Sequence, residues 1–390
     1  MAGIYIHIPF CEKKCIYCDF YSITNKSLID YFITSLLKEI TLFADAINKA
    51  GKKSVETIYF GGGTPSILSP KAFGKIFETL YQKFNINEQC EITIECNPGT
   101  DFTSKLSEFK SLGINRISIG VQSLQPEELK FLTRIHTRNQ AIEAIERTLS
   151  FFENVNVDII FSLPYQTRET LLQTLDEILK YDIKHFSTYS LIYEEKTPLY
   201  YKVKNKEILS KSDEEDYDLY MLIVNILKER NFEHYEVSNY ARNVFKSLHN
   251  LNYWRNGEYY GFGPSAHSFW GNKRSWNIRS LRKYIQAIEN NTLPLEGFEN
   301  IDTEKRIIES IMLGLRAEGI SISKFRKEFG VDLPSISSDL IQNWIKYGKA
   351  NVYDDYIKLT DEGYFICDKL VLDLIENVLN YLGTKFTRCT

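Results

Sequence analysis

Strands and helices alternate six times through the first half of this chain, and that alternation limits its possible folds more than any other feature. Extended runs such as 3–8 and 55–60 are separated by segments with helical apolar spacing, such as 28–50. The remaining extended runs cover 91–95, 116–122, 155–161 and 185–191. Six β–α units in series predict an α/β fold, a parallel sheet closed into a complete or partial (β/α)6 TIM-like barrel with helices outside.

Three cysteines, Cys11, Cys15 and Cys18, follow the first expected strand with the spacing CxxxCxxC. Three thiolates on one short loop can bind three irons of a [4Fe–4S] cluster and leave the fourth iron without a protein ligand. The spacing alone also allows a structural zinc site, with His7 or a distant side chain as the fourth ligand.

Two further loops are expected beside the cysteines. GGGTPS follows the second strand, and Asn97-Pro98-Gly99 follows the third. The carboxyl ends of parallel strands meet at one edge of a sheet, where such folds bind their ligands. We therefore expect all three loops to form one site.

The overall composition excludes several classes of protein. A net charge of −4 argues against a general nucleic-acid binder, which is normally basic. No secretory apolar segment and no apolar run of about 18 residues occurs, so we expect a cytoplasmic protein without a transmembrane segment. The odd total of 7 cysteines fits reduced thiols rather than a disulfide framework.

The length of 390 residues predicts more than one domain. We expect the barrel over 1–235, a barrel extension and linker over 236–298, and a small helical, winged-helix-like domain over 299–390. The linker signals are the Pro, Gly and Asn residues of 292–300. The C-terminal elements are expected to be helices over 303–317, 322–329, 335–347 and 361–380, and a hairpin over 351–360.

Eight motifs occur in an order that resembles the radical S-adenosylmethionine (SAM) superfamily. Within it, the chain is similar to the oxygen-independent coproporphyrinogen III oxidase family and its haem-chaperone (HemW-like) branch. The motifs are YIHIPFCEKKCIYCDF, GGGTPS, IECNPG, NRISIGVQS, VDIIFSLPYQT, YEVSNYA, HNLNYW and GFGPSAHS. The resemblance covers nearly the whole chain, and eight motifs in order make chance agreement very improbable.

The resemblance implies that Cys11, Cys15 and Cys18 hold a [4Fe–4S] cluster and that SAM completes its open iron. The side chains and backbone segments implied to contact SAM or the cluster are Tyr5, Tyr17, Gly62, Gly63, Thr64, Glu95, Gln122, Arg134 and Asp158. We expect the glycines to let the backbone approach SAM, and Glu95 to accept from its ribose hydroxyls. Barrel packing for the two tyrosines, and an internal ion pair for Arg134 and Asp158, remain alternatives.

One departure separates the chain from the oxidase. The oxidase has a further cysteine two positions after its third cluster cysteine, whereas here Asp19 is followed by Phe20. The loss is typical of the chaperone branch, as is the motif HNxxYW. Its His249 is a candidate haem ligand, or else it hydrogen-bonds across the barrel mouth. His267, in the AHS motif, is the less favoured haem ligand.

The resemblance therefore implies a haem chaperone that binds the cluster, SAM and haem and transfers haem to an acceptor haemoprotein. The alternative function is oxygen-independent coproporphyrinogen III oxidase, and a radical SAM enzyme with another substrate is a third possibility. A reductant such as flavodoxin or ferredoxin is an implied partner. Peripheral membrane contact remains open, and nucleic acid is not an expected partner.

Overall fold

Six parallel strands form the centre of the fold, as the alternation predicts. The structure, a computed structural model, describes residues 2–47 and 53–387. The six central strands lie in sequence order within one sheet, each parallel to the next. They are β1 (Ala2–Ile8), β2 (Ser54–Gly62), β3 (Asn85–Cys96), β4 (Arg116–Gln122), β5 (Asn154–Phe161) and β6 (His185–Ser190).

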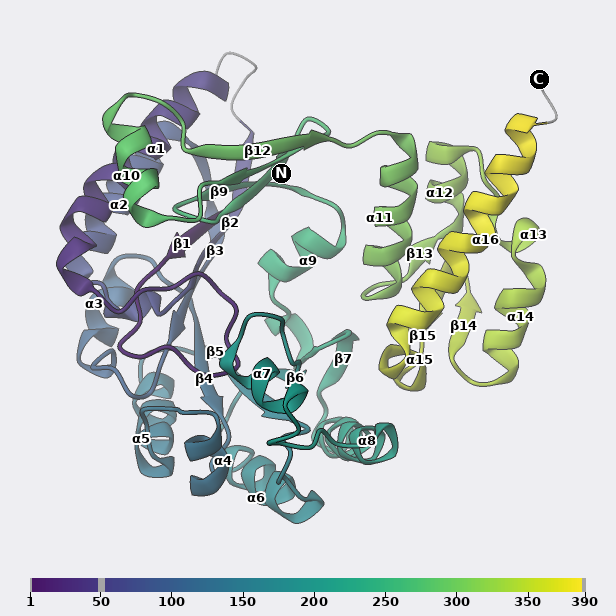
Figure 1. The fold of residues 1–390 in the computed structure, drawn as a ribbon, viewed down its shortest axis with the longest axis horizontal. Helices are drawn as coiled ribbons and strands as arrows, with labels where there is room; N and C mark the ends of the chain where they lie inside the picture. Colours follow the sequence, from purple (N-terminus) through teal and green to yellow (C-terminus); the bar gives the residue numbers. More distant parts are fainter. Residues whose placement is uncertain (1, 48–52, 388–390) are drawn as a thin grey trace.

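Helices on the outside of these strands complete the β–α units (Figure 1). They are α1 (Ile29–Ile47), α2 (Pro70–Lys83), α3 (Leu106–Ser111), α4 (Pro126–Phe131), α5 (Arg138–Leu149) and α6 (Arg168–Ile178). The Ser69 side chain caps α2 and Pro70 occupies its first turn, because neither position needs an intrahelical N–H bond there. The first helix was expected over 28–50, of which 48–50 lie outside the described residues.

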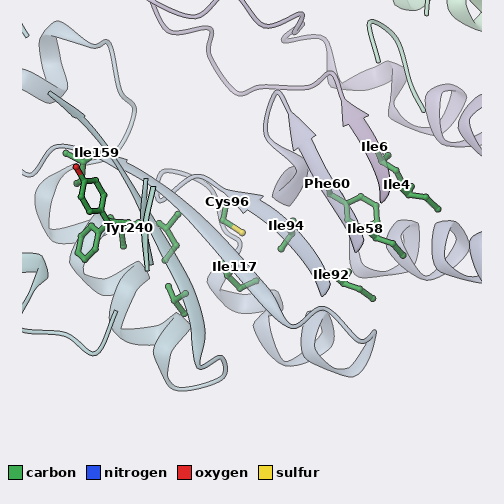
Figure 2. Packing of buried hydrophobic residues seen from close by; sticks show 14 of the residues in the cluster. Ile4, Ile6, Ile58, Phe60, Ile92, Ile94, Cys96, Ile117, Ile159 and Tyr240 are labelled. Carbon is green, nitrogen blue, oxygen red and sulfur yellow. The ribbon is translucent and has the colours of Figure 1, made fainter. Parts of the chain in front are cut away.

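Strand alternation gives the barrel an apolar outer layer and a polar interior. Figure 2 shows isoleucines of β1 to β5, such as Ile6, Ile58 and Ile117, with Phe60 among them in the buried cluster. The residues between them point the opposite way, because successive side chains of a strand alternate between faces. In β4, for example, the apolar set is Ile117, Ile119 and Val121, and the intervening set is Arg116, Ser118, Gly120 and Gln122.

The sheet is wider than the sequence predicted. Strand β9 (Glu258–Phe262) adds parallel to β1, and β10 (His267–Trp270), β11 (Lys273–Asn277) and β12 (Leu295–Asn300) continue antiparallel from it. At the other edge, β8 (Asn239–Ala241) and β7 (Glu233–Glu236) pair antiparallel beyond β6. The helices of this part are α7 (Pro198–Lys204), α8 (Asp213–Glu229), α9 (Leu248–Trp254) and α10 (Leu281–Glu289).

The linker expected over 292–300 is wrong, because most of this stretch is β12. Its Gly297 is paired with Trp276, and a Cβ there would lie 2.5 Å from the Trp276 ring. An edge strand tolerates glycine, and here the missing side chain makes room for an indole. The same residue was read as a chain breaker.

Residues 303–387 form a C-terminal domain that lies to one side of the sheet (Figure 1). Its helices are α11 (Thr303–Leu315), α12 (Ile322–Phe329), α13 (Leu333–Ile336), α14 (Ser338–Lys346), α15 (Asp361–Phe365) and α16 (Cys367–Thr387). The expected hairpin is confirmed as β14 (Ala350–Tyr353) and β15 (Tyr356–Leu359), joined by the short β13 (Ile320–Ser321). The single helices expected over 335–347 and 361–380 are each broken in two, the first at Ser337, whose φ of −124° leaves the helical region.

Candidate functional site

The three cysteines lie on a loop that folds back against the end of β1. The Cys11 amide donates to the Ile23 carbonyl at 3.0 Å, and the Ile23 amide donates to the Pro9 carbonyl at 2.7 Å, which ties the two ends of the loop together. The three thiols are free and half-buried. As free thiols they resist ionisation, because burial raises the pKa of Cys11 and raises the pKa of Cys18 to about 11.

The donor set of this loop fits a cluster. In the part of the chain that the structure describes, no three His, Cys, Asp or Glu side chains are grouped so that they could hold one metal ion. A [4Fe–4S] cluster does not require such a group, because each thiolate binds a different iron. Two polar side chains stabilise the sulfurs: Thr64 Oγ1 donates to Cys11 Sγ at 3.6 Å, and Arg134 Nη1 donates to Cys15 Sγ at 3.5 Å.

The glycine segment after β2 lies directly against the start of the cysteine loop. The Gly63 amide donates to the Ile8 carbonyl at 2.8 Å, and a Cβ on Gly63 would lie 2.6 Å from the Phe10 carbonyl oxygen. A Cβ on Gly62, whose φ is +112°, would lie 2.6 Å from the His7 ring. These glycines therefore allow close packing between two loops, a different reason for glycine from the approach to SAM that we expected.

Glu95 joins the end of β3 to the glycine segment. Its Oε2 accepts the Gly62 amide at 3.2 Å, and its Oε1 accepts the Tyr59 hydroxyl at 2.8 Å. Burial, together with the negative charge of Asp158, raises the pKa of Glu95 to about 7 despite these two donors. The carboxyl group can therefore gain or lose a proton near neutral pH, and its lone pairs face the site.

Arg134 bridges the cysteine loop and β4. Besides Cys15, its guanidinium donates to Tyr17 Oη at 3.4 Å and to the Gly120 carbonyl at 2.8 Å. Its Nε and the Oε1 of Gln122 are both buried without a hydrogen-bond partner. Buried polar atoms are normally paired, so these two atoms fit a site that completes its hydrogen bonds with a polar ligand.

Asp158 belongs to a hydrogen-bond network inside the barrel. Its carboxylate accepts from Asn156 at 2.7 Å and from Ser118 at 3.3 Å, and the Asn156 oxygen lies 2.6 Å from Nδ1 of His185. Burial raises the pKa of Asp158, and the charge of Arg116 opposes that rise. The ion pair considered for Arg134 and Asp158 does not form, because neither is the other's partner in these contacts.

Sequence reasoning missed several members of this interior. Arg116 is one of the largest fully buried side chains, and its charge acts on both Glu95 and Asp158. The signal was present in the strands themselves, where a polar residue recurs at every second position between isoleucines and valines. Polar side chains on the inner face of a barrel strand indicate an interior that binds a ligand rather than a packed core.

Tyr5 and His249 also lie in the barrel interior. Tyr5 Oη is 3.1 Å from His7 Nδ1, and its ring stacks on Tyr59 with centroids 6.3 Å apart. His249 is 1% exposed, with Nδ1 2.8 Å from Thr57 Oγ1 and Nε2 2.9 Å from Tyr253 Oη. This geometry favours the alternative reading of His249, a hydrogen-bonded side chain rather than an iron ligand.

Comparison with known proteins agrees with this architecture. Residues 5–178 match the Radical SAM superfamily, and residues 301–366 match the HemN C-terminal domain. The chain is 32% identical to the haem chaperone HemW of Bacillus subtilis, over 93% of this chain and 96% of that protein. It is also 32% identical to HemW of Lactococcus lactis, over 95% and 97% of the two chains. The chain belongs to the HemW family of radical SAM proteins.

A solved structure places the fold more closely. The coproporphyrinogen III oxidase HemN of Escherichia coli, a radical SAM enzyme, superposes with a TM-score of 0.82 at 21% identity, covering 96% of this chain and 90% of the other. The HemW-like chain therefore has the radical SAM fold with the C-terminal domain of that oxidase. Among the described helices, none has the length and apolar character needed to cross a bilayer.

Membership of the radical SAM superfamily implies a [4Fe–4S] cluster and SAM as cofactors. The residues present fit both groups: three free thiols on one loop, two glycines that bring β2 against it, and buried polar atoms of Gln122 and Arg134 without partners. The order of the motifs along the chain thus becomes one continuous site at the carboxyl ends of β1 to β5.

Proposed function

We propose that this chain is a haem chaperone, which binds a [4Fe–4S] cluster, SAM and haem and passes haem to an acceptor haemoprotein. The observation that carries the proposal is the similarity to curated HemW proteins over almost the full length of both chains. The cysteine loop and the polar barrel interior support it, because a protein without cofactors would have no use for unpaired buried polar atoms at this position.

In this proposal Cys11, Cys15 and Cys18 hold the cluster, and together the cluster and SAM supply one-electron chemistry. Glu95 accepts from the SAM ribose, and Arg134 neutralises negative charge beside Cys15. Tyr5, Tyr17, Gly62, Gly63, Thr64, Gln122 and Asp158 line the same site. The burial of Glu95 and Asp158 keeps bulk water away from it.

The alternative is oxygen-independent coproporphyrinogen III oxidase, favoured by the shared fold of HemN over 96% of the chain. Likeness at 21% identity supports the fold and not the substrate. The Asp19-Phe20 sequence, which lacks the oxidase's additional cysteine, favours the chaperone.

The deciding experiment uses the full chain with its cluster reconstituted under anaerobic conditions. One sample is reduced and incubated with SAM and coproporphyrinogen III, and the porphyrinogen mass is followed. A second is loaded with haem and mixed with apomyoglobin as a probe acceptor. We expect no decarboxylation and a measurable transfer of haem. Loss of two carboxyl groups per porphyrinogen over many turnovers would establish the oxidase instead.

The proposed surroundings follow from the same function. We propose a cytoplasmic protein whose partners are an acceptor haemoprotein and a reductant such as flavodoxin or ferredoxin, with peripheral membrane contact where the acceptor is a membrane protein. The division into 1–235, 236–298 and 299–390 is proposed as its domain organisation. Pull-down of acceptor haemoproteins by the haem-loaded chain would test the first of these.

A further inference from the structure

A pocket of about 480 Å³ lies between β1, the loop after Cys18 and the β9–β11 segment, and Leu313 of α11 in the C-terminal domain also lines it. Its volume is in the range of small-molecule and cofactor sites, which form preferentially between domains. It contacts the cysteine loop through Asp19, Phe20 and Tyr21 but contains none of the three cysteines. The pocket is therefore a neighbour of the cofactor site.

His267 lines this pocket and differs from every other histidine of the chain. All 6 histidines fall within the described residues, and five are buried: His7, His136, His185, His234 and His249. His267 is exposed, and its side chain makes no hydrogen bond to any described residue, its recorded neighbour being the Trp276 ring at 6.1 Å. An imidazole must be accessible and have a free nitrogen lone pair to bind iron from a ligand that arrives from solvent.

The electrostatic environment keeps this imidazole in the state that can bind iron. Its partly enclosed position and the nearby charge of Arg274 lower the pKa of His267. It is therefore neutral at physiological pH, and a neutral imidazole is the form that ligates metals. His249, by contrast, would have to give up bonds to Thr57 and Tyr253 first.

Aromatic side chains form the walls on both sides of His267. Tyr259 of β9 pairs with Phe269 of β10, two residues from His267 on the same face of the strand. Phe20 on the cysteine loop lines the opposite part and is 62% exposed. A large apolar ring left in solvent at the mouth of a pocket indicates a surface that a flat apolar ligand covers.

Two arginines supply positive charge at the same pocket. Arg274 is already paired with Glu309 at 2.6 Å and with Glu299 at 3.5 Å. Arg279 donates to the backbone carbonyl of Asp19 at 2.9 Å, and its guanidinium has no carboxylate partner among the described residues. A guanidinium without a counter-ion is suited to bind a ligand carboxylate.

We propose that this pocket is the haem site of the chain, with His267 as the axial ligand of the iron, Arg279 facing a propionate, and Phe20 and Tyr259 against the porphyrin. Iron ligation requires only that a ring nitrogen of His267 donate its lone pair, displacing a weaker ligand, with no change in the oxidation state of the iron. The pocket opens to solvent, so haem can leave it for an acceptor. This inference rests on the proposed chaperone function and names its haem site.

The test is a titration of the full-length, cluster-loaded protein with ferric haem, followed by the Soret band and by electron paramagnetic resonance. We expect His267→Ala to weaken haem binding by about tenfold or more, to change the axial-ligand signals, and to leave the melting temperature unchanged because His267 is exposed. Added imidazole should restore the wild-type signals. Arg279→Gln should weaken binding by a few fold, whereas Arg282→Gln, on the exposed side of α10, should not.

The outcomes separate the two proposals. If the wild-type chain binds no haem, the chaperone function fails. If the wild type binds haem and His267→Ala binds it with the same affinity and spectrum, the pocket is not the site and the chaperone function stands. Loss of the axial signals in a folded His249→Ala variant alone would likewise overturn the assignment to His267.

Discussion

Arg134 Nη1 lies 3.5 Å from Cys15 Sγ, so a charged side chain from the turn after α4 donates a hydrogen bond to a predicted cluster ligand. The same guanidinium is anchored on the Gly120 carbonyl at 2.8 Å, which fixes it relative to the end of β4. A cation held beside a cluster sulfur stabilises added negative charge.

Replacement of Arg134 by glutamine should therefore lower the reduction potential of the cluster. One hydrogen bond to a charged group contributes about 1.5–3 kcal/mol, and about 1.4 kcal/mol corresponds to 59 mV for one electron, so we expect a shift of roughly 60 mV or more. Anaerobic redox titration measures it. Arg138→Gln is the matched control, because Arg138 is exposed and pairs with Glu177 at the surface; an equal shift in both variants would contradict the role of Arg134.

Replacement of Cys11, Cys15 and Cys18 by alanine should abolish cluster binding and leave most haem binding. The reason is that the pocket assigned to haem contains none of the three thiols. Iron and sulfide analysis and a Soret titration of the same sample measure the two properties. Cys90→Ala should keep the cluster, since Cys90 is a buried thiol of β3 outside the loop. Loss of haem binding in a folded triple variant would show that the two sites are not separable.

The affinity for SAM should depend on pH through Glu95. Its pKa is raised to about 7 by burial, so the carboxyl group is mostly protonated below that pH and mostly ionised above it. Only the ionised form has both oxygens free to accept, so binding should strengthen about tenfold between about pH 6 and pH 8. Anaerobic calorimetry would measure it. Glu95→Gln should bind weakly at every pH, while Glu88→Gln, exposed on the same strand, should titrate like the wild type.

Gly63→Ala should destabilise the protein and reduce its cluster content. The added Cβ would meet two backbone carbonyl oxygens, at 2.6 Å on Phe10 and 2.9 Å on Ile8, and backbone atoms cannot rotate away. We expect a loss of about 1–3 kcal/mol in the free energy of unfolding. Gly74→Ala, inside α2 with its nearest atom 3.8 Å away, should instead stabilise by about 0.5–1 kcal/mol. Urea unfolding of both variants, with iron analysis, makes the comparison; equal stabilities would refute the packing argument.

The local features of the fold were readable in the sequence. The six strands β1 to β6, the cap at Ser69 and the β14–β15 hairpin were all predicted, because each depends on residues within a few positions of one another. The cysteine loop and the glycine segment were placed on one edge by the same logic, since consecutive parallel strands end at the same edge of a sheet. The resemblance to radical SAM proteins added the cofactors.

The sequence by itself determined the alternating strands, the cluster loop and the family, because these are written in spacing, periodicity and motif order. The tertiary structure alone decided that Gly297 lies in an edge strand, that Arg116 is buried beside Glu95 and Asp158, and that His249 is enclosed while His267 is open. Burial and pairing depend on segments that lie far apart in the sequence. Thr57, for instance, comes 192 positions before the histidine ring that it hydrogen-bonds, and no local pattern around either residue encodes that contact.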